Sequence, residues 1–356
     1  MIRVLYITRA RLSLSRAHTL NIVKTAEAWA AGQMLTPTVM SGAADPVDVA
    51  EIFARKGVHI KFFLDVETRH RSIFLYSIRN RQSFDVLYFR DPLLWPVALA
   101  ARLYGKKVIF EVHGTLEWMF ARPLWRLAIA SSNGFVAITK SIQGFYHSGK
   151  PSIVVHTSGT DNLASVTRDR VSLGMPKDKI VLLYAGSFLW DSIDVLFDTV
   201  LLLPESVVLV ALGIKSDQRI LLERRIIEKE LVGRIICIDR VPPAEVLQYL
   251  AVADILINPL MVSYPSSISS KLYEYLGAGK PIVTSQGGAN EEVIHDGENG
   301  LIVKENTPHM FAGAVERIIN DPELGIRLAR GAEESALLYT WEQRARRITD
   351  FIESLS

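Results

Sequence analysis

The chain has 356 residues, with 40 Lys and Arg against 38 Asp and Glu, and a formal net charge of +2. That length suits two domains of about 150–200 residues, and a hydrophobic content of 49% is enough for two cores. The single cysteine, Cys237, excludes internal disulfides and cysteine-based metal clusters, and it predicts a reducing, cytoplasmic setting.

The charge is unevenly distributed along the chain. Residues 1–160 hold 20 Lys and Arg against 10 Asp and Glu, whereas residues 161–356 hold 20 against 28. A basic first half predicts contact with an anionic partner: a phosphorylated acceptor, an anionic membrane surface or nucleic acid. Scattered, solvated charge is the alternative.

The first half alternates between apolar runs and helical patterns. The start, MIRVLYITRA, predicts a strand rather than a signal peptide, and no apolar run has the length of a membrane span. An amphipathic helix is expected from about residue 20 to 31. Strands are expected at residues 2–8, 36–41, 58–63, 86–89, 108–112, 135–138 and 153–155. This alternation predicts a doubly wound parallel sheet, in which ligands bind at the carboxyl ends of the strands.

Motifs that are missing from the first half count against two classes of protein. No G-x-G-x-x-G follows the first strand, which disfavours a nicotinamide-dependent dehydrogenase. No G-x-x-x-x-G-K-[ST] is present either, which disfavours a P-loop NTPase.

One aromatic and basic segment has two interpretations. EWMFARPLWR, residues 117–126, combines Trp118, Phe120 and Trp125 with arginines, a mixture that suits a membrane interface. Packing against the neighbouring domain explains it equally well, and Pro123 makes a long regular helix unfavourable.

The second half continues the alternation of expected strands and helices. Strands are expected at residues 180–185, 207–212, 234–239, 255–259, 282–284 and 301–303, with helices at 246–253, 310–319 and 322–338. The polar stretch 161–177 reads as a linker. We therefore expect an N-terminal domain at 1–165, a C-terminal domain at 166–340 and a final helix at 341–356.

The stretch YPSSISSKLYEYLGAGKPIVTS, residues 264–285, is the most informative in the chain. Serines favour N-cap positions, and the free amides, helix dipole and Lys271 at such an end suit a phosphate or diphosphate. Glu274, one turn further on, has the chemistry to accept hydrogen bonds from the vicinal hydroxyls of a ribose. An ordinary capped helix with a solvated Glu is the alternative.

These segments resemble the retaining glycosyltransferases of family 4, also called glycosyl transferases group 1, which have two Rossmann-like domains facing a central cleft (the GT-B fold). Glu274 followed by GAGKPIVTS matches the second half of the donor-binding signature, and Ser266 stands where the signature has its first Glu. Further matching phrases are SRAH, YFRDPLL, FEVHG and GSF, in the expected order. The loop at Gly186 and Ser187 lacks the Arg and Lys that the family usually carries there.

The resemblance implies a role for each matching position. The catalytic candidates are His113, on the donor sugar, and Lys271 and Glu274, on the diphosphate and ribose. The implied donor-binding residues are Gly186, Ser187, Arg240, Val241, Ser266, Ser267, Ser269, Ser270, Lys271 and Glu274. The implied cleft or acceptor residues are Arg16, His18 and Arg90. The resemblance also implies that no metal or other cofactor is required. The nucleotide-diphosphate sugar is a co-substrate.

The implied acceptor is a glycan or a lipid-linked sugar in polysaccharide synthesis, with the protein cytoplasmic or peripheral on the inner membrane face. Nucleic acid is not expected as a partner, because no recognition motif accompanies the basic charge. The competing hypothesis is a degenerate, non-catalytic relative that binds a nucleotide or scaffolds another glycosyltransferase. A sugar-nucleotide epimerase would need catalytic carboxylates that the sequence does not reveal.

Overall fold

The computed structural model describes residues 1–11, 17–42, 61–63, 70–114, 122–146, 148–159, 169–186, 190–260, 266 and 268–355. Two compact units make up the chain: unit 1 is Met1–Ser158 with Trp341–Ser356, and unit 2 is Gly159–Thr340. The sequence placed this boundary between residues 165 and 166, slightly later than the structure does. A side chain at Gly159 would lie 2.6 Å from the backbone oxygen of Tyr273, so only glycine fits where unit 2 begins.

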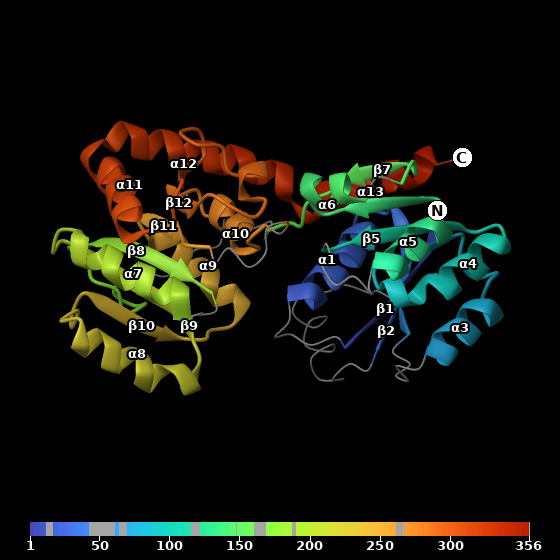
Figure 1. The fold of residues 1–356 in the computed structure, drawn as a ribbon, viewed down its shortest axis with the longest axis horizontal. Coiled ribbons are helices and arrows are strands. Elements are labelled where there is room, and N and C mark those ends of the chain that lie inside the picture. Colours follow the sequence, from blue (N-terminus) through green and yellow to red (C-terminus); the bar gives the residue numbers. More distant parts are fainter. Residues whose placement is uncertain are drawn as a thin grey trace. The chain divides into compact units, whose positions relative to one another are not determined.

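Unit 1 is a seven-stranded parallel sheet in the order β3-β2-β1-β4-β5-β6-β7, covered by helices (Figure 1). Its elements are β1 (Ile2–Arg11), α1 (Ala17–Ala31), β2 (Leu35–Gly42), β3 (Lys61–Phe63), α3 (His70–Arg79), β4 (Val86–Phe89), α4 (Trp95–Leu103), β5 (Lys107–Val112), α5 (Arg122–Ser131), β6 (Gly134–Ala137), α6 (Lys140–Phe145), β7 (Ser152–Val154) and α13 (Trp341–Ser354). Both faces of the sheet are buried: Leu5 and Ile7 enter one core, and Val4 and Tyr6 enter the other. This is why the strands are almost continuously apolar.

The C-terminal helix α13 packs beside α1 on one face of the unit 1 sheet. Ile348 and Ile352 of α13 share a core with Ile22 and Trp29 of α1. The indole N–H of Trp29 donates to the Ala345 carbonyl oxygen at 3.1 Å. Residues more than 300 positions apart in the chain therefore form one layer.

The structure describes the second part of the aromatic and basic segment. Pro123 lies in the first turn of α5, where its missing N–H is not needed, and this helix of ten residues begins only one residue before the proline. Trp125 is buried in the core of unit 1, stacked on Tyr146 with ring centroids 5.6 Å apart. It serves neither a membrane interface nor packing between domains, whereas Trp118 and Phe120 lie outside the described residues.

Unit 2 is a six-stranded parallel sheet in the order β10-β9-β8-β11-β12-β13. Its elements are β8 (Ile180–Ala185), α7 (Trp190–Leu202), β9 (Val207–Ile214), α8 (Ser216–Glu228), β10 (Ile235–Asp239), α9 (Pro243–Val252), β11 (Ile255–Asn258), α10 (Lys271–Gly277), β12 (Ile282–Ser285), β13 (Leu301–Val303), α11 (Pro308–Asn320) and α12 (Pro322–Ala336). The strand order reverses between β8 and β11, and such a switch point is where doubly wound sheets bind ligands. The predicted pair of doubly wound parallel sheets is confirmed.

Within the described part of the chain, no helix combines the length and the apolar character that crossing a membrane requires.

Candidate functional site

Helix α10 is fixed at the switch point of unit 2 by a buried tyrosine. The Tyr275 hydroxyl accepts a hydrogen bond from the Ala185 N–H at 2.8 Å and donates to the Ile257 carbonyl oxygen at 3.4 Å. Ala185 ends β8 and Ile257 lies in β11, so one side chain ties the helix to both strands that flank the switch point. Tyr275 is fully buried, which excludes water from these bonds.

The loop that leads into α10 rests on buried amides. The Ser269 N–H donates to Asn290 Oδ1 at 3.1 Å, and the Ser269 hydroxyl donates to Asn258 Oδ1 at 3.3 Å. Asn258 in turn donates to the Thr284 hydroxyl at 3.0 Å. Buried, satisfied polar groups of this kind fix a single loop conformation.

In the described part of the expected phosphate cradle, two backbone amides are already bonded within the protein. Ser270 precedes α10 in a helical conformation and makes no side-chain capping bond, so the predicted serine cap is wrong. The Ser269 amide is committed to Asn290, and the Gly186 amide donates to the Leu212 carbonyl at 3.0 Å. Neither of these two N–H groups is therefore available to a ligand, because each already donates a hydrogen bond within the protein.

The Lys271 ammonium lies at the carboxyl end of β8. Its Nζ is 3.8 Å from the centroid of the Tyr184 ring, a cation–π contact. A Cβ added to Gly186 would come within 2.7 Å of the same Nζ, and the φ of +149° at Gly186 favours glycine there. Lys271 and Gly186, both predicted from the sequence as donor-binding residues, thus meet.

Burial shifts the pKa of both charged groups on α10. Desolvation lowers the pKa of Lys271 to about 7, although the Glu274 charge opposes this. Desolvation also raises the pKa of Glu274 to about 6, although the Lys271 charge opposes this. Among the described residues, no salt bridge compensates either group.

The other expected donor-binding residues belong to three separate segments of unit 2. Ser266 is buried, and Arg240 and Val241 directly follow β10, where the Arg240 N–H is bonded to the Ile214 carbonyl at 3.1 Å. Ser187 and Ser267 lie outside the described residues.

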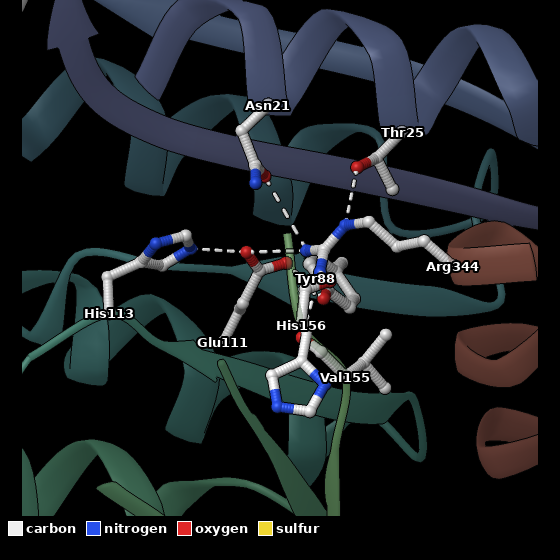
Figure 2. Close-up of polar contacts among 8 residues, drawn as sticks. All are labelled: Asn21, Thr25, Tyr88, Glu111, His113, Val155, His156 and Arg344. Atoms are coloured by element: carbon white, nitrogen blue, oxygen red, sulfur yellow. Dashed lines mark hydrogen bonds and ion pairs between the residues drawn. The ribbon is translucent and has the colours of Figure 1, made fainter. Parts of the chain in front are cut away.

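A second polar cluster lies in unit 1 around Glu111 of β5 (Figure 2). The Glu111 carboxylate is fully buried; its Oε1 bonds His113 Nε2, and its Oε2 accepts from the Tyr88 hydroxyl. The His113 side chain, just beyond the strand, keeps 22% of its surface exposed. The ring therefore reaches solvent while its partner does not.

Arg344 of α13 supplies the positive charge for this cluster. Its Nη2 lies 2.8 Å from Glu111 Oε1, and its Nε donates to the Thr25 hydroxyl at 3.0 Å. Its Nη1 donates to the carbonyl oxygens of Val155 and His156, at 3.0 and 2.8 Å. With Asn21 Oδ1 at 3.5 Å from Nη2, the described residues alone supply an acceptor for each of the five N–H donors of the guanidinium (Figure 2).

The cluster has a defined charge state. Burial alone would raise the pKa of Glu111, but Arg344, His113 and Arg90 together hold it well below its usual range. Burial, with the charge of Arg90, lowers the pKa of His113 to about 4 against the opposing effect of Glu111. The carboxylate is therefore ionised and the imidazole neutral at neutral pH.

Of the expected cleft residues, Arg90 helps to lower the pKa of His113 through its charge. The two residues can interact because Arg90 follows β4, His113 follows β5, and these strands are neighbours in the sheet. Arg16 lies outside the described residues, and His18 lies on α1 with its side chain outside the described part.

Sequence reasoning missed Glu111, Arg344, Tyr184 and Asn258. Glu111 had a signal, since a lone carboxylate in the apolar strand KVIFEV needs a buried partner. No sequence signal singled out Arg344, because it is one of three arginines on an amphipathic helix.

Comparison with known proteins agrees with this architecture. The Anabaena protein HepE, solved in complex with UDP, superposes over 100% of both chains with a TM-score of 0.81 at 16% sequence identity. Two Rossmann-like parallel-sheet domains with this match define a GT-B protein.

Residues 165–335 match the family described as glycosyl transferases group 1. This match covers most of unit 2 and agrees with the resemblance read from the sequence.

Curated relatives carry glycosyltransferase names. A D-inositol 3-phosphate glycosyltransferase of Nocardioides is 34% identical over 31% of this chain and 24% of its own length. An uncharacterized glycosyltransferase of Methanocaldococcus jannaschii is 24% identical over 70% of this chain and 69% of its own. The matches to the D-inositol 3-phosphate glycosyltransferases of Nocardioides and Corynebacterium glutamicum span only about a quarter of those proteins.

Proposed function

We propose that this chain transfers a sugar from a nucleotide-diphosphate sugar to a hydroxyl group of a glycan or lipid-linked acceptor, with retention at the anomeric carbon. The observation that carries the proposal is the position of Lys271 Nζ, above Gly186 at the switch point, with Glu274 one turn along the same helix. These residues lie in the region that matches glycosyl transferases group 1. The UDP in the HepE complex supports a uridine nucleotide.

The chemistry follows from the charge that develops on the leaving group. The bond between the anomeric carbon and the diphosphate breaks, and its electron pair stays on the diphosphate, where Lys271 stabilises it. The acceptor oxygen bonds to the anomeric carbon on the same face, and its proton passes to the departing phosphate. In this scheme Glu274 accepts hydrogen bonds from the ribose, and His113 contacts the donor sugar.

The test is transfer or donor hydrolysis by the purified chain with a panel of nucleotide sugars. We expect activity with at least one donor and its loss in Glu274→Ala, while Glu323→Ala, an exposed carboxylate on α12, stays active. UDP binding with no turnover of any donor would instead support the non-catalytic scaffold.

We further propose that a cationic and apolar face of unit 1 meets an anionic membrane surface carrying the acceptor. No Asp or Glu occurs between Asp91 and Glu111, or between Glu117 and Asp161. Arg102 of α4 donates to the Ala130 carbonyl of α5 at 2.9 Å, and Arg126, Phe145 and Lys150 line one adjoining hollow. Leu103, Tyr104, Leu127 and Phe145 are exposed large hydrophobic side chains of this face.

Vesicle flotation tests the membrane proposal. Vesicles rich in anionic lipid should bind the protein in a salt-sensitive manner, and neutral vesicles should not. The double variant Arg126→Glu, Phe145→Ser should lose binding, whereas Arg224→Glu, an exposed arginine of unit 2, should keep it. Equal binding to both vesicle types would contradict the proposal.

A further inference from the structure

Glu111 joins the C-terminal helix to the predicted catalytic histidine. Its Oε1 contacts both His113 and Arg344, and Arg344 is held by α1 and by the chain after β7. Of these three side chains, Glu111 and Arg344 expose at most 1% of their surface, whereas His113 exposes 22%. Glu111 and Arg344 therefore form a rigid, buried support, and the His113 ring is the one group of the three that a ligand can reach.

The contact with Glu111 decides which nitrogen of His113 carries the proton. An ionised carboxylate only accepts hydrogen bonds, so the imidazole must donate through Nε2–H. A neutral imidazole has a single N–H, which leaves Nδ1 as a hydrogen-bond acceptor. Burial and Arg90 keep the ring neutral, because they lower its pKa to about 4.

We propose that Glu111 and Arg344 are positioning residues: Arg344, from the last helix, fixes the Glu111 carboxylate, and Glu111 holds His113 as the Nε2–H tautomer with Nδ1 presented to a ligand hydroxyl. The ligand class is a polyhydroxylated one, such as the sugar of the donor, so the catalytic part of this inference rests on the proposed function. Helix α13, which follows the end of unit 2 at Thr340, thereby contributes a residue to the site in addition to packing on the unit 1 sheet.

A purely structural role predicts something different. If the Glu111–Arg344 pair only fastened α13, any loss of a polar contact between α13 and the sheet would have the same consequence for activity. Arg347 offers the matched control, because it lies one turn further along α13 and donates to the Val154 carbonyl at 2.8 Å without touching Glu111.

Nitrogen-15 NMR of histidine-labelled protein measures the tautomer directly. The chain has eight histidines, and the His113 signal is assigned by its absence in His113→Gln. The wild-type ring should show Nε2 protonated and Nδ1 unprotonated at pH 7. An Nδ1–H tautomer or a protonated ring in the wild type would overturn the proposal, whatever the activity of the protein.

Variants then test the consequence for catalysis. Glu111→Gln should shift His113 towards the Nδ1–H tautomer and lower kcat by about 10- to 100-fold with a smaller change in KM. Arg347→Met should change neither. In a His113→Ala background, Glu111→Gln should have no further effect on kcat, because Glu111 acts through the ring.

The outcomes separate the two proposals. If no donor is turned over by the wild type, the proposed function fails, while the tautomer measurement still decides the positioning role. If Glu111→Gln does not fold, the double variant Glu111→Gln, Arg344→Met removes both buried charges and carries the same expectations. An equal loss of kcat in Glu111→Gln and Arg347→Met would contradict the positioning role.

Discussion

The two candidate sites handle buried charge in opposite ways. In unit 1, Glu111 and Arg344 meet at 2.8 Å, and the guanidinium has an acceptor for each of its donors. In unit 2, Lys271 faces an aromatic ring and the partly buried Glu274 has a raised pKa, with no salt bridge for either within the described residues. The buried charges of the unit 1 site are paired with each other, whereas Lys271 and Glu274 of the unit 2 site form no salt bridge within the described residues.

This difference indicates which site is built to receive charge. A fully paired network gains little from a further ion, so the unit 1 cluster is suited to orienting a neutral ring. An uncompensated cation at a switch point gains a partner when a diphosphate arrives, and that gain increases as the leaving group acquires charge. The comparison predicts that stability depends mainly on the first site and ligand affinity on the second.

The largest expected effect is on stability in unit 1. Arg344→Met leaves the Glu111 carboxylate buried without its cation and should lower the free energy of unfolding by about 3–5 kcal/mol in urea denaturation. Arg347→Met removes an exposed contact of the same helix and should cost less than about 1 kcal/mol. Similar losses in both variants would mean that the buried pair is not the special contact.

Next comes the loss of catalysis in unit 2. Lys271→Met should reduce kcat/KM by about 10²–10³-fold, because a cation aimed at the developing charge is removed. Its melting temperature should stay the same or rise, since a poorly solvated charge is gone. Lys179→Met, an exposed lysine at the opposite end of β8, is the control and should keep its activity.

A smaller effect is the pH dependence of nucleotide binding. Lys271 titrates near pH 7 in the free protein, so its charge is present below that pH and is lost as the pH rises. UDP is already ionised above pH 7, and its affinity should therefore weaken by up to about tenfold per pH unit above 7 in calorimetry. In Lys271→Met the affinity should be lower and flat across this range; a wild type with flat affinity would show that Lys271 is not the group involved.

The smallest effect concerns the ring below Lys271. Tyr184→Leu removes the cation–π contact and should weaken UDP binding by about two- to fivefold, whereas Tyr184→Phe keeps the ring and the affinity. If the Phe variant binds as weakly as the Leu variant, the hydroxyl and not the ring face is responsible.

The sequence predicted both sheets because buried parallel strands are apolar on both faces and end abruptly. It placed Arg90 and His113 just beyond strand ends for the same reason, and it placed Lys271 and Glu274 on the helix that follows the serine-rich loop. It was wrong about the serine cap, because cap chemistry depends on the conformation of Ser270.

By itself, then, the amino-acid sequence determined the two-unit parallel-sheet architecture and the polar residues that follow its strands, because strand periodicity and motif spacing are local properties of the chain. Only the tertiary structure decided that Arg344 completes the Glu111 cluster, that Asn258 and Asn290 hold the loop before α10, and that the Gly186 and Ser269 amides are already bonded. The partners in these contacts are distant in sequence. Their bonds depend on desolvation and geometry that exist only after the sheets and helices have packed.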